Sequence, residues 1–134
     1  MFTTCGFFSI VEKPDDRAGG TLTVRARDQG DLEALRDRHL PGLGPIVEHA
    51  GTDYRFRAKA AKAEVAAAMA RMIDDIGYSN FKDEVARRQG KARAALYGRV
   101  WNVMYGLQPA SKAVPESAAP GAAKTSAWGG VLVD

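Results

Sequence analysis

The sequence predicts an α+β protein, with helices on one face of a four-stranded, mostly antiparallel sheet in the order ββα-ββαα, plus an extended C-terminal tail. Two observations predict this class. Apolar and cationic residues alternate with period two in Tyr54-Arg55-Phe56-Arg57-Ala58-Lys59, which is a strand pattern with one packed and one basic face. Apolar residues repeat at helical spacing over much of residues 62–107. The chain therefore combines strand and helix patterns, as an α+β class requires.

The first half of the chain predicts two strands and one helix. Alternation over residues 6–13 predicts the first strand, and the polar, glycine-containing residues 15–20 predict a loop. Residues 21–27 alternate again and predict the second strand. Asp28 then provides an N-cap for a helix that the Pro- and Gly-rich residues 41–45 terminate.

The second half predicts a hairpin followed by helices. Residues 46–49 and 54–60 predict the third and fourth strands, joined by a turn. An alanine-rich stretch over residues 62–76 predicts a helix, which Gly77 is placed to stop. After it, Asn80 is a candidate N-cap for a further helix, broken or bent at Gly90.

The last predicted helix carries two apolar stripes. One is predicted to face the core and contains Leu96, Val100, Val103 and Leu107. The other lies beside it and repeats every four residues as Tyr97, Trp101 and Tyr105.

Composition predicts one compact domain over residues 1–108 and a tail over residues 109–134. The tail is rich in Pro, Ala, Ser and Gly, a composition that buries too little apolar surface to fold alone. Its end is apolar and contains Trp128, Val131 and Leu132, which fits a short docking motif.

Charge and cysteine content indicate an ordinary soluble protein. The 19 Lys and Arg residues against 16 Asp and Glu give a net charge of +3, too mild to argue by itself for nucleic acid. The single cysteine, Cys5, cannot form an intramolecular disulfide and suits a reducing compartment. We expect neither a signal peptide nor a transmembrane segment, no membrane partner, and a location in the cytoplasm or, for a phage protein, in the virion.

Residue types suited to catalysis are few and scattered. His39, His49, Asp53 and Cys5 form no local triad or metal-ligand signature, and no glycine-rich loop follows a strand as phosphate binding would require. We therefore expect no catalytic residues, no metal and no cofactor, and predict a protein that is not an enzyme.

A protein interface is the first predicted site. Tyr and Trp are enriched at interface anchors, and a helix that is apolar around most of its girth is usually covered on two sides. The preferred function is therefore a small non-enzymatic binding or adaptor protein that contacts a protein partner, or a second copy of itself as a homo-oligomer. The predicted interface comprises Tyr97, Trp101, Met104, Tyr105, Trp128, Val131 and Leu132.

A basic sheet face is the alternative site, and it would make the protein a nucleic-acid or phosphate binder. Its residues share one face if the second and fourth strands are neighbours. The competing interpretation is a solvated face whose charges are neutralised by acidic neighbours such as Asp16 or Glu48. The predicted anion-binding residues are Arg25, Arg27, Arg55, Arg57 and Lys59.

Three segments carry a resemblance to known proteins: Thr52-Asp53-Tyr54-Arg55-Phe56-Arg57, Asp75-Ile76-Gly77-Tyr78-Ser79-Asn80-Phe81-Lys82-Asp83-Glu84-Val85 and Tyr97-Gly98-Arg99-Val100-Trp101. Together they resemble a widespread group of small bacterial proteins of unknown function that also occurs in some actinobacterial phages. The resemblance spans about residues 6–108 and implies no catalytic residues. Within these segments, the residues best suited to a site are Asp53, Tyr54, Tyr78, Asn80 and Lys82, each of which also has a structural explanation as a cap, turn or packing residue.

Overall fold

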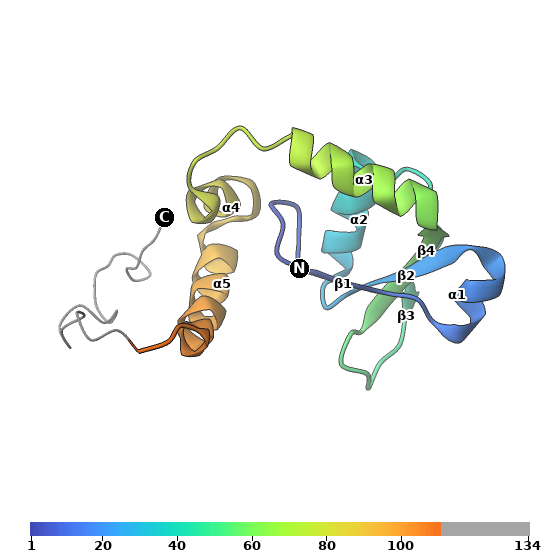
Figure 1. The fold of residues 1–134 in the computed structure, drawn as a ribbon, viewed down its shortest axis with the longest axis horizontal. Coiled ribbons are helices and arrows are strands. Elements are labelled where there is room, and N and C mark those ends of the chain that lie inside the picture. The colour runs from blue at the N-terminus through green and yellow to red at the C-terminus, as the bar shows by residue number, and fades with distance from the viewer. Residues whose placement is uncertain (111–134) are drawn as a thin grey trace. The chain divides into compact units, whose positions relative to one another are not determined.

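The computed structural model describes residues 1–110, and its contacts divide the chain into two units, Met1–Gly77 and Tyr78–Asp134. Figure 1 shows the strands in the first unit and two helices in the second. The predicted tail residues Trp128, Val131 and Leu132 lie outside the described residues. Over the described residues, no helix has the length and apolar character needed to cross a membrane.

The sheet of the first unit has four strands, β1 (Phe8–Val11), β2 (Thr21–Ala26), β3 (Val47–Glu48) and β4 (Phe56–Ala61). They lie in the order β1-β2-β4-β3, and every neighbouring pair is antiparallel. The predicted α+β class and four-stranded antiparallel sheet are therefore confirmed. The second and fourth strands are direct neighbours, which is the condition for a shared basic face.

Helices α2 (Gln29–Arg38) and α3 (Lys62–Asp74) cover one face of this sheet (Figure 1). Strand residues with even numbers point toward them, because side chains alternate along a strand. The resulting core is made by buried side chains that include Phe8, Val24, Ala26, Leu32, Leu35, Ala58, Ala60, Val65 and Ala68. The opposite face of the sheet lies away from these two helices.

The loop prediction for residues 15–20 was wrong, because residues 15–19 belong to helix α1 (Pro14–Gly19). Proline favours the first turn of a helix, and the carboxylate of Asp16 accepts a hydrogen bond from the backbone N–H of Lys13 at 2.8 Å. Gly20 then ends the helix with a left-handed backbone, φ 69°. A short polar helix of this kind has no apolar stripe, which is why the pattern suggested a loop.

Local capping fixes the start of α2 as predicted, since the Asp28 side chain accepts a hydrogen bond from the Gly30 N–H at 3.2 Å. Its end is joined to α3, because the Arg71 guanidinium donates to the backbone carbonyl of His39. Helix α3 itself ends at Asp74, before the predicted Gly77 stop. The side chains of Ile73, near its end, and of Ile76, which follows it, are exposed.

The second unit is helical over its described part and contains α4 (Phe81–Gln89), α5 (Lys91–Met104) and a 3₁₀ turn at Tyr105–Leu107. Asn80 caps α4 as predicted, because its side chain accepts a hydrogen bond from the Asp83 N–H at 2.9 Å. The predicted break at Gly90 is also present. This residue has φ 98°, a value that favours glycine.

Candidate functional site

The face of the sheet away from α2 and α3 carries the predicted basic residues, and we call it the open face. The strand register puts Arg25 directly opposite Arg57 and Thr23 opposite Lys59. On the outer strands, Ser9 pairs with Arg25 and Val47 with Arg57. The structure therefore brings cations from two distant segments together in one place.

A buried carboxylate lies at the α1 end of the open face. Asp16 is fully buried, and its carboxylate accepts hydrogen bonds from the hydroxyls of Thr21 at 2.6 Å and Thr23 at 2.7 Å. The Lys59 ammonium donates to the same carboxylate at 2.6 Å and lies 3.4 Å from the carboxylate of Asp15. We call Asp16, Thr21, Thr23 and Lys59 the Asp16 network.

The Asp16 network keeps both charges in place. Burial alone would raise the pKa of the Asp16 carboxyl, but the hydrogen bonds from Lys59, Thr21, Thr23 and the Lys13 backbone outweigh it and lower that pKa below its ordinary value. The hydrogen bond to Asp16 raises the pKa of Lys59. Asp16 and Lys59 therefore both stay ionised at neutral pH. The positive charge of Lys59, one of the predicted anion-binding residues, is already paired with a carboxylate.

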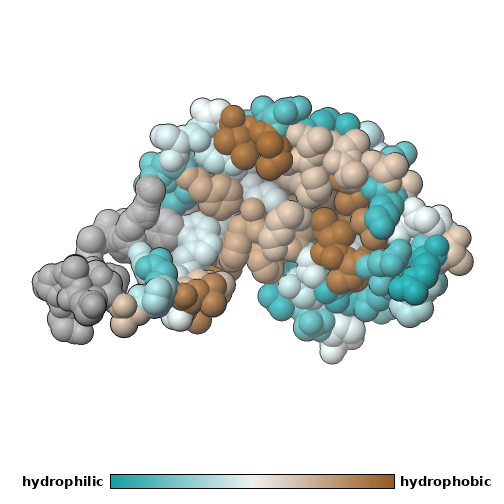
Figure 2. Space-filling view, in the orientation of Figure 1, coloured by the Kyte–Doolittle hydropathy of each residue, from teal (hydrophilic) through white to brown (hydrophobic). Residues whose placement is uncertain are grey.

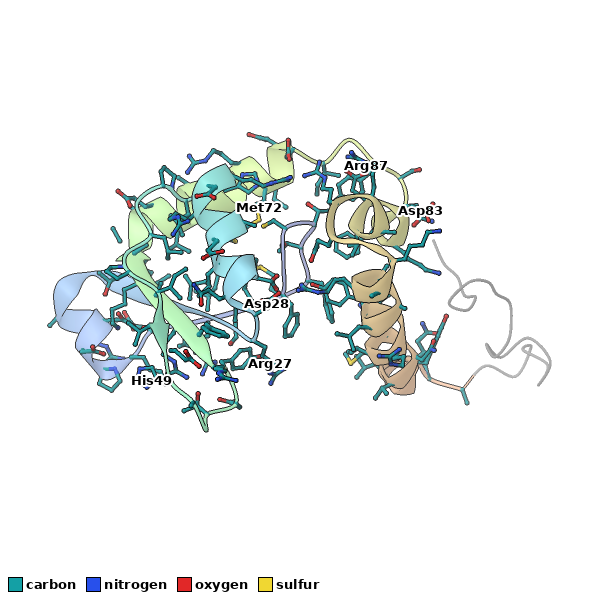
Figure 3. All side chains as sticks on the ribbon, turned by 180° about the vertical axis from the view of Figure 1, so that it is seen from behind. Arg27, Asp28, His49, Met72, Asp83 and Arg87 are labelled. Carbon is teal, nitrogen blue, oxygen red and sulfur yellow. The ribbon has the colours of Figure 1, made fainter. Side chains whose placement is uncertain are left out.

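Three of the predicted cations, Arg25, Arg27 and Arg57, contact Asp53 or Tyr54 in the segment before β4. The guanidinium carbons of Arg25 and Arg27 lie 4.7 and 4.3 Å from the centre of the Tyr54 ring. Arg27 Nε also donates to the Asp53 carbonyl at 2.8 Å, and an Arg57 N–H donates to the Tyr54 carbonyl at 3.1 Å. The prediction that Tyr54 lies in β4 on the packed face was therefore wrong, because β4 begins at Phe56. Figure 3 labels Arg27 in this cluster.

The fifth predicted cation, Arg55, forms an exposed ion pair with Glu48 at 2.6 Å. All five predicted anion-binding residues thus have contacts within the chain. Arg55 and Lys59 face carboxylates, whereas within residues 1–110 the hydrogen bonds of Arg25, Arg27 and Arg57 go to neutral groups. This arrangement weakens the case for a broad nucleic-acid surface, because the Tyr54 ring is already covered by guanidinium groups.

A pocket of about 410 Å³ opens on the same face between α1, β4 and the segment around β3, and we call it the sheet pocket. Its lining includes Thr23 and Lys59 of the Asp16 network. Gly44 lines one wall, where its N–H donates to the Lys59 carbonyl at 2.8 Å. The lining residues are Lys13, Asp15, Thr23, Gly44, Pro45, Val47, His49, Arg57, Ala58 and Lys59.

The second unit has an aromatic cluster between its two helices. The ring centres of Phe81 and Trp101, and those of Tyr97 and Trp101, are 5.8 Å apart, and Tyr78 lies 6.2 Å from Phe81. Tyr97 is only 3% exposed, and its hydroxyl lies 3.2 Å from a nitrogen of Arg93. Two predicted interface residues, Tyr97 and Trp101, are therefore packing residues of this unit.

The predicted core stripe of the last helix is instead exposed, so that expectation was wrong. Val103 is 76% and Leu107 is 75% exposed, and Leu96 and Val100 are exposed as well. We call these four residues the α5 stripe. The predicted interface residues Met104 and Tyr105 are exposed near it. Figure 2 shows hydrophobic residues, in brown, reaching the surface at the C-terminal end of α5.

The residues suited to catalysis or metal binding, His39, His49, Asp53 and Cys5, belong to no metal-binding cluster among the described residues. Among the described residues, no three His, Cys, Asp or Glu side chains lie close enough together to hold a metal ion. His39 is buried at the end of α2, whereas His49 is exposed and lines the sheet pocket. Burial raises the pKa of the Cys5 thiol, which makes a reactive thiolate less accessible.

The residues highlighted by the resemblance have local structural roles. Tyr78 packs on Phe81, Asn80 caps α4, and the Asp53 carbonyl accepts the hydrogen bond from Arg27. Partial burial lowers the pKa of Lys82. No sequence pattern predicts the sheet pocket, since its lining comes from four separate stretches of chain, at residues 13–15, 23, 44–49 and 57–59.

No protein-family model, curated protein or solved structure matches this chain. The resemblance to small bacterial proteins therefore stays a prediction.

Proposed function

We propose that this protein is a non-enzymatic adaptor that binds an amphipathic helix of a partner protein along the α5 stripe. The observation that carries the proposal is the exposure of Leu96, Val100, Val103 and Leu107 in one line along α5 and the turn after it. Contiguous exposed apolar side chains of this kind are typical of interaction surfaces. The proposal keeps the helix that the sequence singled out but moves the contact to its other apolar stripe.

The spacing of the α5 stripe suits a helical partner. Its residues follow one another in steps of four, three and four, which is the alternation of core positions in a coiled-coil heptad. A facing helix can therefore place its own apolar side chains between them along the whole length of the stripe. An extended peptide would match the repeat poorly, because side chains on one face of a strand recur every second residue.

The charge beside the stripe defines the partner further. Residues 91–107 contain Lys91, Arg93 and Arg99 and no acidic residue. By helical spacing, Arg93 and Arg99 flank the stripe, whereas Lys91 lies on the opposite side of the helix. Acidic side chains flanking the apolar face of the partner helix would meet Arg93 and Arg99 at the edge of the contact. A second copy of the same helix would instead bring like charges together, which favours a different protein over self-association.

The test uses the full chain and a synthetic probe helix with leucine at its two core heptad positions and glutamate at the flanking positions. Binding is measured by fluorescence anisotropy of the labelled probe. We expect Val103→Glu to weaken binding by at least about tenfold, because it places a charge in the centre of an apolar contact. Since Val103 is 76% exposed, the helical circular-dichroism spectrum is expected to stay unchanged.

The matched control is Asn102→Glu, which adds the same charge at the adjacent exposed position outside the α5 stripe. Its affinity for the probe is expected to stay within about twofold of the wild type. A probe with lysine in place of glutamate should bind more weakly. Equal loss of binding in both variants would contradict the proposal, as would a wild-type dimer in light scattering that Val103→Glu converts to a monomer.

A further inference from the structure

We propose that the sheet pocket is a second, independent site, which binds a small organic anion with one phosphate or carboxylate group on a compact apolar body. The inference concerns the first unit alone and does not rest on the proposed role of α5. Its volume of about 410 Å³ falls within the range of about 300–1,000 Å³ that small-molecule sites occupy. Four observations define the ligand.

The charge of the lining favours an anion. Lys13, Arg57 and Lys59 contribute three cations, whereas the acidic groups are Asp15 in the lining and Asp16 beneath it. Lys59 is already paired with these two carboxylates, so Lys13 and Arg57 are the cations through which the pocket attracts a ligand. His49 adds a further nitrogen donor or acceptor at the rim.

Arg57 is the residue with the clearest need for an anion. Its Nε is buried and has no hydrogen-bond partner among residues 1–110, and the same is true of the Nε of Arg25, which lies directly opposite. Like charges opposed across two strands destabilise a sheet, and an unsatisfied buried donor adds to that cost. An anion beside the Arg57 guanidinium would offset the repulsion, and planar guanidinium groups bind phosphate and carboxylate through paired hydrogen bonds.

The walls of the sheet pocket select for an organic ligand over a bare ion. Pro45 and Val47 present apolar surface beside the cations. Gly44 allows the segment before β3 to approach β4 closely, since a Cβ atom at this position would lie 3.2 Å from the Lys59 carbonyl oxygen. An anionic group near Arg57 would therefore leave the rest of the ligand against an apolar wall.

The neighbouring aromatic residue argues against a nucleic acid as the ligand. Single-stranded nucleic acids bind proteins by stacking bases on exposed rings. The ring of Tyr54, whose carbonyl accepts a hydrogen bond from Arg57, instead contacts the guanidinium groups of Arg25 and Arg27. A small molecule that needs one anion contact and one apolar wall fits this face better.

The test is an NMR titration of the ¹⁵N-labelled full chain with phenyl phosphate, benzoate and, as the uncharged analogue, phenol. We expect phenyl phosphate or benzoate to shift the amide signals of Gly44, Val47 and Lys59, and phenol to leave them in place. The two anions separate a phosphate-binding site from a carboxylate-binding site. Inorganic phosphate is expected to bind at least about fivefold more weakly than phenyl phosphate, because it lacks an apolar body.

Arg57→Gln is expected to weaken the binding of phenyl phosphate or benzoate, whichever binds to the wild type, by at least about tenfold, because it removes the positive charge. Glutamine retains a hydrogen-bond donor for the Tyr54 carbonyl, which keeps the local structure. The matched control is Arg55→Gln, which removes a cation from the same strand region outside the sheet pocket and should change the affinity by less than about twofold. Preserved amide spectra of both variants away from the substituted residue check the fold.

Three results would overturn the inference. The first is no shift of the sheet-pocket amides with either anion up to about 10 mM, a concentration at which even weak complexes with dissociation constants near 1 mM form. The second is equal binding by phenol. The third is stronger binding of a ten-nucleotide single-stranded DNA with shifts centred on Arg25 and Arg27, which would favour a nucleic-acid surface.

Discussion

Replacing Asp16 with asparagine is expected to lower the free energy of unfolding of the first unit by about 2–4 kcal/mol at pH 7, the largest effect we expect on this unit. The carboxylate accepts hydrogen bonds from two threonine hydroxyls, one backbone N–H and the Lys59 ammonium. Asparagine keeps the volume but removes the charge and one acceptor oxygen. Urea unfolding, followed through the NMR signals of β2 and β4, measures the change.

The same variant gives a pH dependence with a definite sign. The pKa of Asp16 in the folded protein lies below its unfolded value of about 3.9, so the folded state releases the proton more readily. Its contribution to stability is therefore fully present above that value and is lost as the pH falls toward the folded pKa. We expect the stability difference between wild type and Asp16→Asn to be constant from pH 7 to about pH 5 and to shrink below about pH 4.

Asp15→Asn provides the matched control, because this neighbouring carboxylate also faces Lys59 but is 73% exposed. Its removal should change the stability by no more than about 0.5 kcal/mol. If both variants were equally stable, the buried position of Asp16 would have no energetic role. A difference between wild type and Asp16→Asn that persists undiminished near pH 2 would show that the charge is not its source.

Tyr97→Ala is expected to destabilise the helical pair of the second unit by about 3–5 kcal/mol, the range found for large aromatic side chains removed from cores. Tyr97 is 3% exposed and packs against Trp101, which in turn packs against Phe81 of α4. Removing the ring therefore opens a cavity in the cluster that joins the two helices. Thermal unfolding by circular dichroism, together with the NMR signals of α4 and α5, measures the loss.

The neighbouring residue supplies the control for this prediction. Leu96→Ala removes an apolar side chain that is 46% exposed, so we expect a cost of about 1 kcal/mol or less. Alanine has the best helix propensity at both positions, which leaves packing as the difference between the two variants. A larger loss from Leu96→Ala than from Tyr97→Ala would restore the α5 stripe to the core and remove the basis of the proposed adaptor function.

The sequence by itself determined the features that depend on neighbours along the chain. Period-two alternation identified β2 and the part of β4 from Phe56 onward, because a strand must place successive side chains on opposite faces. The caps at Asp28 and Asn80 and the break at Gly90 were also predictable, since each depends on backbone groups within three residues or on one dihedral angle. The antiparallel α+β architecture followed from the order of these elements.

Other features were decided only by the tertiary structure. Helix α1 has no apolar stripe, and the carboxylate of Asp16 finds Lys59 far along the chain. On α5, two apolar stripes lie side by side, and periodicity cannot say which one packs against α4. In the structure, the aromatic stripe packs against α4 through the contact of Trp101 with Phe81, and Val103 of the other stripe is exposed. The physical reason is common to these cases: burial depends on partners from distant segments, which a local pattern does not contain.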